Sequence, residues 1–391
     1  MKKKSMPMRT LAALLLLATL TGCSTMRGWF SKDDDKAGVP AGLTEFTASA
    51  NPSKLWSVNV GKGEKRLGVR QRPAVADGRV YAAAVKGGVR AYDLQTGSQV
   101  WSYQSDARLT GGPAAADGLV VVGGLDGEVV ALDAATGAEK WQAKVSNEVI
   151  TAPSIGQGLV LVRSNDGRIT AFDAQTGAQR WFYNTDLPSL TVRGNAPVLL
   201  GPGVAFVGND DGTLSAMAIN DGRLLWNQAV GVPDGRTELE RMADVDGAPV
   251  LDGSTVFATS FKNETVAVDG PSGRPLWSRA RGGAGGIAVA GPSVLVADSA
   301  GTVWALDRNT GEPRWSNTTL ARRSLTAPAV HGDYAVVGDF DGYVHWLRLE
   351  NGELAARARA DGNAIRAMPV VADGTLLVQD TGGKVTAFGL R

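Results

Sequence analysis

Acids, hydroxyls and indoles recur at a fixed spacing along this chain of 391 residues. In the stretch from Val129 to Trp141, a short apolar run is followed by Asp133, Thr136 and Trp141. Taken alone, this trio could be a reactive motif, and the series of tryptophans could be a stacking platform for a cofactor. The same pattern returns with four other acids, at Asp93, Asp173, Asp269 and Asp307. Its period must therefore be explained before any chemistry is assigned to it.

Few other residues have side chains that could catalyse a reaction or bind a metal. The two histidines, His331 and His345, and the single cysteine, Cys23, are too few for a His/Cys metal site. The acidic run at residues 33–35 lacks the spaced oxygen ligands and turn glycine of a calcium loop, so we interpret it as solvated linker. The net charge of +1 is not concentrated into the basic patch that nucleic-acid binding needs. We predict no catalytic residue, no metal, no cofactor and no nucleic-acid partner.

Each repeat predicts one blade of a β-propeller. Within residues 113–144, four short apolar runs are separated by Asp-Gly pairs at 117–118 and 126–127 and by an Asp-x-x-Thr-Gly connection at 133–137. Asp-Gly between apolar runs is a strong hairpin signal, because both central residues of a type I′ turn need positive φ. Four antiparallel strands in roughly 40–45 residues is the size of a propeller blade.

The blades are expected to close into a ring of eight. A proline marks the start of each first strand, at Pro73, Pro113, Pro153, Pro197, Pro249, Pro292, Pro328 and Pro369. The last unit ends after its third strand, whereas residues 55–60 are a fourth strand that lacks the first three. We predict that this N-terminal strand completes the last blade and removes the open ends of the stack. The fold class is therefore all-β, an eight-bladed β-propeller of four-stranded antiparallel blades over residues 51–391.

The tryptophans favour packing over a cofactor platform, because they recur from blade to blade. Seven of the ten occupy the same fourth-strand position: Trp56, Trp101, Trp141, Trp181, Trp226, Trp277 and Trp315. A large aromatic ring there can fill the wedge between neighbouring blades, which widens away from the axis. Ala356 occupies this position in one blade, which we expect to be the weakest.

The N-terminus has the anatomy of an export signal. Residues 1–22 combine a basic start with an apolar run at 11–20 that is too short to span a membrane. The end of this segment, Leu20-Thr21-Gly22-Cys23, is similar to the lipobox of bacterial lipoproteins. That resemblance implies a signal peptide at 1–22, acylation of Cys23 and, because Ser24 follows, sorting to the outer membrane. The polar residues 23–50 are predicted to be a flexible tether between lipid and body.

The Ala-x-Asp-x-x-Thr-Gly motif, followed by a tryptophan in the fourth strand, resembles the quinoprotein (PQQ-type) repeat. This resemblance covers residues 51–391. One family with this repeat is the quinoprotein dehydrogenases, which bind pyrroloquinoline quinone and calcium in the channel. Those enzymes typically carry a vicinal cysteine pair and large insertions. This chain has one cysteine, and no carboxylate cluster outside the repeat register suggests a calcium site. A membrane-tethered PQQ-dependent dehydrogenase is therefore the alternative interpretation.

The other family is BamB, the lipoproteins of the outer-membrane β-barrel assembly (BAM) machinery. The lipobox, the tether, the eight short blades and the total length together resemble this family. The resemblance implies a non-catalytic scaffold, lipid-anchored on the periplasmic face of the outer membrane. It implies BamA, through its periplasmic POTRA domains, as the partner and, through BamA, contact with the other lipoproteins of the complex. Nascent outer-membrane proteins are a further possible partner, accepted at exposed strand edges by β-augmentation.

Two long intervals break the repeat and are the candidate functional sites. The interval from Trp181 to Trp226 contains a segment at 187–194, and the interval from Trp226 to Trp277 contains a segment at 231–247. Both precede first strands of neighbouring blades, so we expect them side by side on one face. The first offers aliphatic and basic side chains and the second offers acids: Leu190, Val192, Arg193, Asp244 and Asp246. We predict an apolar centre with a charged rim that binds protein. The alternative is that these are simply two long loops without a binding role, with their aliphatic side chains buried. The resemblance to BamB implies that these segments dock BamA.

Overall fold

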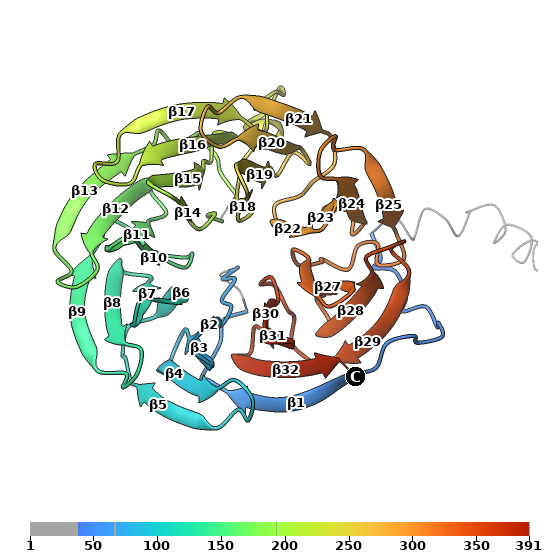
Figure 1. Ribbon diagram of the computed structural model, residues 1–391, viewed down its shortest axis with the longest axis horizontal. Helices are drawn as coiled ribbons and strands as arrows, with labels where there is room; N and C mark the ends of the chain where they lie inside the picture. Colours follow the sequence, from blue (N-terminus) through green and yellow to red (C-terminus); the bar gives the residue numbers. More distant parts are fainter. Residues whose placement is uncertain (1–37, 66–67, 193, 391) are drawn as a thin grey trace, which may run out of the picture. The chain divides into compact units, whose positions relative to one another are not determined.

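The computed structural model describes residues 38–65, 68–192 and 194–390, and residues 41–391 cluster into one compact unit. Within that unit, 32 strands form eight four-stranded antiparallel sheets arranged as blades around a ring (Figure 1). The predicted eight-bladed propeller is confirmed. Seven blades are made of four consecutive strands, and the eighth combines both ends of the chain.

The first four blades comprise β2 (Ala74–Ala76), β3 (Arg79–Ala84), β4 (Gly88–Asp93), β5 (Gln99–Tyr103); β6 (Leu109–Ala116), β7 (Leu119–Gly124), β8 (Glu128–Asp133), β9 (Glu139–Lys144); β10 (Ser154–Gly156), β11 (Leu159–Arg163), β12 (Arg168–Asp173), β13 (Gln179–Asn184); and β14 (Leu199–Gly201), β15 (Val204–Gly208), β16 (Thr213–Ala218), β17 (Leu224–Ala229). The last four comprise β18 (Val250–Asp252), β19 (Thr255–Thr259), β20 (Thr265–Asp269), β21 (Pro275–Arg279); β22 (Ile287–Ala290), β23 (Ser293–Ala297), β24 (Val303–Asp307), β25 (Pro313–Asn317); β26 (Ala329–His331), β27 (Tyr334–Gly338), β28 (Tyr343–Arg348), β29 (Leu354–Arg359); and β30 (Val370–Ala372), β31 (Thr375–Gln379), β32 (Lys384–Leu390) with β1 (Pro52–Asn59).

The ring is closed by the N-terminal strand, as predicted. Strand β1 lies antiparallel to β32, in a register that runs from Pro52 opposite Leu390 to Asn59 opposite Lys384. The sheet order is β1-β32-β31-β30, so the outermost strand of the last blade comes from the start of the propeller. Both free ends of the stack are thereby paired.

The repeated acid and hydroxyl build turns. Asp133 Oδ1 accepts hydrogen bonds from the backbone N–H of Thr136 at 3.0 Å and from the Thr136 hydroxyl at 2.9 Å. Gly137 follows with φ +75°, and a Cβ there would lie 2.6 Å from the ring of Trp101 in the preceding blade. The glycine is therefore required both by its left-handed conformation and by the indole that packs on it.

The fourth-strand tryptophans join seven of the eight blades to the next blade. The indole N–H of Trp101 donates to the carbonyl of Ala134 at 2.9 Å, and Trp141 donates to Ala174 at 2.9 Å. The other five tryptophans of the fourth-strand series bond in the same way to the blade that follows, at Leu94, Ile219, Gly270, Arg308 and Leu349. The ring thus fills the wedge while its polar atom is satisfied.

Blade seven replaces this contact rather than losing it. In the second blade Ala131 faces Trp141, whereas in the seventh Trp346 faces Ala356, so the large and small residues have exchanged strands. Trp346 is fully buried and packs edge-on against Phe388 of β32, with ring centroids 5.7 Å apart. The expectation that this blade is the weakest rests on Ala356 alone, whereas the structure places the large side chain on the neighbouring strand β28.

Two further expectations need correction. Pro292 does not begin a first strand but lies in the turn after β22, because a Gly-Pro pair suits a turn. Part of the expected flexible tether is also docked. The backbone N–H groups of Ser49 and Ala50 both donate to Ala355 O on the outer strand of blade seven, and Arg357 donates to Thr44 O at 3.1 Å. The predicted leader at 1–22 and the predicted acylation site Cys23 lie outside the described residues.

Candidate functional site

The site is built from two loops that leave the regular blades. The first loop occupies residues 185–198, between β13 and β14, and the second occupies residues 230–249, between β17 and β18. A short helix, α2 (Glu238–Arg241), forms within the second loop. It starts at a capping box, in which Thr237 Oγ1 accepts from Glu240 N–H and Glu240 Oε2 accepts from Thr237 N–H, each at 3.2 Å.

The two loops lie side by side, as their positions in the repeat predict. The backbone N–H of Val192 in the first loop donates to Asp244 Oδ1 in the second at 2.8 Å. Gly194 lies so close to Asp246 that a Cβ at this position would be 2.4 Å from a carboxylate oxygen. The second loop therefore fixes the path of the first through Asp244, and this close approach requires glycine at 194.

The exposed part of the site is apolar with acids around it. Leu190 is 43% exposed, whereas Val192 is only partly exposed. Leu190 borders a groove of about 550 Å³ between the loops, lined by Pro188, Ser189, Leu190, Asp211, Pro233, Asp234, Gly235, Glu238 and Arg241. Arg193 lies outside the described residues.

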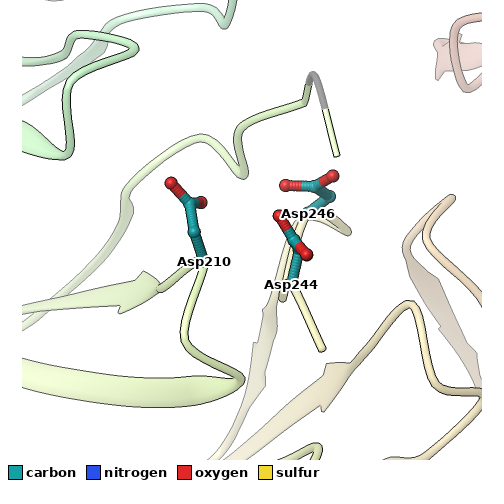
Figure 2. Close-up of side chains that lie close together, drawn as sticks. All are labelled: Asp210, Asp244 and Asp246. Carbon is teal, nitrogen blue, oxygen red and sulfur yellow. The ribbon is translucent and has the colours of Figure 1, made fainter. Parts of the chain in front are cut away.

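The acids predicted to form the charged rim are not on the surface. Asp244 is 0% and Asp246 is 4% exposed, so the predicted position of these two carboxylates is wrong. Together with Asp210, in the turn after β15, they form a buried cluster whose nearest oxygens all lie within 4.8 Å of one another (Figure 2). Asp244 holds the first loop through its hydrogen bond with Val192, whereas the acids that line the groove are Asp211, Asp234 and Glu238. The sequence shows which loops carry acids but not which way each side chain turns.

A buried guanidinium compensates one of the three charges. Arg163 Nη2 lies 2.7 Å from Asp210 Oδ1, and Arg163 also donates to Gly208 O. Burial is the largest cause that raises the pKa of Asp244, to about 6, and the pKa of Asp246, to about 7. The negative charge of Asp244 raises the pKa of Asp246 further. Among the described residues, Asp244 Oδ2 and both oxygens of Asp246 have no hydrogen-bond partner.

This cluster corrects the expectation that no carboxylates gather outside the repeat register. Three carboxylates could offer oxygen ligands to a cation. One of them is already bound by Arg163, however, and a guanidinium within the cluster favours a buried ion-pair network over a cation site.

Arg163 and Asp210 were not identified from the sequence. Arg163 ends an apolar strand, where the same position in other blades carries small or polar residues such as Gly123, Gly208 and Thr259. A charged residue at the end of a buried strand needs a partner. Arg163 at this position is therefore the feature of the sequence that indicates a buried ion pair.

The comparisons with known proteins identify the family. The family described as "Outer membrane protein assembly factor BamB" matches residues 50–110 and 85–317. A protein of that name from Xanthomonas campestris is 60% identical over all of this chain and 99% of its own length. The chain belongs to the BamB family. Relatives of the same name from Pseudomonas aeruginosa and Escherichia coli are 42% and 34% identical, over 97% and 96% of this chain and 98% and 97% of their own lengths.

Solved structures agree with the BamB fold. The crystal structure of BamB from Moraxella catarrhalis has a TM-score of 0.80 and 28% identity, and it covers 87% of this chain and 100% of its own. The quinohemoprotein alcohol dehydrogenase of Comamonas testosteroni has a TM-score of 0.67 at 16% identity, over 86% of this chain and 76% of its own. At that identity the likeness concerns the fold alone. Among the described residues of this BamB-family chain, helices are too short to cross a membrane.

Proposed function

We propose that this protein is a non-catalytic scaffold of the outer-membrane β-barrel assembly machinery that binds BamA through the two loops. The observation that carries the proposal is the link between the loops. Asp244 accepts the Val192 N–H at 2.8 Å, so two segments more than fifty residues apart present one surface. Names of relatives that contain "outer membrane protein assembly factor" support the biological role.

The groove fits a protein partner. It combines the exposed Leu190 with the apolar Pro188 and Pro233, and it has acids at its border. An apolar centre surrounded by polar groups is the usual arrangement of a protein-binding surface. Of the acids that line it, Asp234 is paired with Lys262 and Glu238 with Arg241. Asp211 has no ion pair among the described residues, which favours a partner segment with a basic side chain beside it.

The anchor acts with this surface. Acylation at Cys23 would confine the propeller to the periplasmic face of the outer membrane and raise its effective concentration near BamA. The docked residues 41–50 would then determine which part of the ring lies nearest the lipid, since they run along blade seven. The POTRA domains of BamA are the expected contact, and the other lipoproteins of the complex would be reached through them.

The test is affinity capture from solubilised outer membranes with the full-length tagged chain. We expect BamA to be the main captured protein and Leu190→Ala to reduce its recovery at least fivefold, because truncation of a central apolar side chain commonly costs about 1–2 kcal/mol. The matched control is Leu276→Ala, at a leucine that is 45% exposed on β21 away from the loops. Equal recovery of BamA by the two variants would place the docking surface elsewhere.

A further inference from the structure

A second cavity lies at one mouth of the central channel. It has a volume of about 80 Å³ and is bordered by residues three positions before the first-strand prolines of five blades: Arg70, Ile150, Gly194, Asp246 and Arg366. Much of the remaining border is glycine and alanine, including Gly112, Ala152 and Ala248. Small residues leave the backbone and the few long side chains accessible to a ligand.

Basic side chains outnumber acidic ones around this cavity. Arg70, Arg72 and Arg366 border it, and Asp246 is the one acid among its described lining residues. The three arginines come from blades one and eight, which are adjacent where the ring closes (Figure 1). Asp246 comes from the loop before blade five, so the basic side chains gather on one part of the rim.

Arg72 is the central group. It borders both this cavity and the channel of about 570 Å³ behind it. Its side chain is partly buried, and Nη1 donates to the weak acceptor Met368 Sδ at 3.8 Å. No carboxylate of the described chain pairs with it. Burial alone lowers the pKa of Arg72, as expected of a desolvated cation without a compensating charge.

The other two arginines differ in the hydrogen-bond partners that they already have. Arg70 donates from Nη1 to Ala284 O in the loop before blade six at 2.9 Å, so it is held across the cavity and retains further donors. Arg366 is exposed, and no ion pair engages it within the described ranges. A guanidinium presents several N–H donors in one plane and matches the oxygens of a carboxylate or phosphate.

We propose that this cavity is an oxyanion-binding site, in which Arg72 and Arg366 bind the carboxylate or phosphate group of a small anion. The ligand would compensate the desolvated charge of Arg72 and would close the channel at this mouth. This site is distinct from the groove beside Leu190, and the proposal does not depend on BamA binding.

The test is isothermal titration calorimetry of the full-length chain in detergent, with inorganic phosphate and with citrate at constant ionic strength. We expect saturable binding of at least one anion at a single site, and the two titrations distinguish a phosphate from a carboxylate ligand. Arg72→Gln and Arg366→Gln should each weaken binding about tenfold, because each removes charge-assisted hydrogen bonds. Asp246→Asn should strengthen it, because a negative charge is removed from the same cavity.

The matched control is Arg223→Gln, at an exposed arginine beside the outer strand β17. It should bind the anions like the natural chain. Thermal unfolding of every variant verifies that the propeller is intact, and Arg366→Gln tests the proposal even if Arg72→Gln does not fold. Absence of saturable binding with both anions, or equal affinities for Arg366→Gln and Arg223→Gln, would overturn the proposal.

Discussion

At the scale of single residues, the buried acids of the second loop connect stability to function. Asp244 and Asp246 are buried and do not line the groove, yet Asp244 accepts the Val192 backbone N–H and so fixes the first loop. We therefore expect Asp244→Ala to weaken BamA capture by releasing the first loop rather than by removing a contact. Arg193→Ala is expected to weaken capture as well, as a residue of the same loop.

The raised pKa of Asp246, to about 7, predicts a pH-dependent stability. A carboxyl whose folded pKa lies above its unfolded value contributes stability at low pH that is lost as pH rises through the folded pKa. Asp246 is faced by Asp210, Asp244, Arg163 and Arg70, and ionisation adds a buried negative charge among them. The change in thermal midpoint caused by Asp246→Asn should therefore be more favourable at pH 8 than at pH 5, by about 1–5 °C.

The control for this measurement is Asp133→Asn. Hydrogen bonds from Thr136 lower the pKa of the partly exposed Asp133, so it is ionised in both folded and unfolded chains between pH 5 and 8. Its effect should not change over that interval. An equal effect of Asp246→Asn at the two pH values would contradict the assignment of a raised pKa.

At the scale of elements, the contacts between blades decide stability. Trp346 takes over in blade seven the packing that the fourth-strand indoles supply elsewhere, and its N–H donates to His331 Nδ1 at 3.2 Å. We expect Trp346→Ala to lower the free energy of unfolding by about 3–5 kcal/mol, as much as Trp141→Ala, because both leave a large cavity. Chemical denaturation measures both values, and a much smaller loss for Trp346→Ala would indicate that blade seven is loosely packed.

The elements show what a sequence can predict and why the rest is hidden. Turn residues and strand periods are local, so the strands, the ring closure at β1 and the two loops were predictable. The exchange of Trp346 and Ala356 and the pairing of Arg163 with Asp210 depend on contacts between strands or blades. In the sequence, such contacts are visible only as residues that differ from the repeat at the same position. The burial of Asp244 and Asp246 left no signal, because an acid in a loop is usually solvated.

At the scale of the whole molecule, closure of the ring makes the N-terminal strand essential. Deletion of residues 51–60 removes β1 and exposes the edge of β32, whereas deletion of residues 26–38 leaves both β1 and the docked segment at 41–50 in place. We expect the first deletion to lower the thermal midpoint sharply and the second to leave it unchanged within about 2 °C. Equal midpoints for the two deletions would contradict the role of β1 in closing the ring.

At the same scale, the groove and the cavity are two sites for which we propose different ligands. The groove beside Leu190 is proposed to hold BamA, and the cavity beside Arg72 is proposed to hold a small anion. Arg366→Gln should therefore leave BamA capture unchanged, and Leu190→Ala should leave anion affinity unchanged. Asp246 belongs to the buried cluster with Asp244, which fixes the first loop, and it also borders the cavity, so its substitution is expected to affect both.

The most direct test of the central proposal is site-specific photo-crosslinking in intact cells. A photoreactive amino acid placed at position 190 should form a crosslink to BamA, because Leu190 is 43% exposed at the groove. The same amino acid placed at position 276, on the outer strand β21, should not. A crosslink to BamA from position 276 but not from position 190 would contradict the proposal that the two loops form the docking surface.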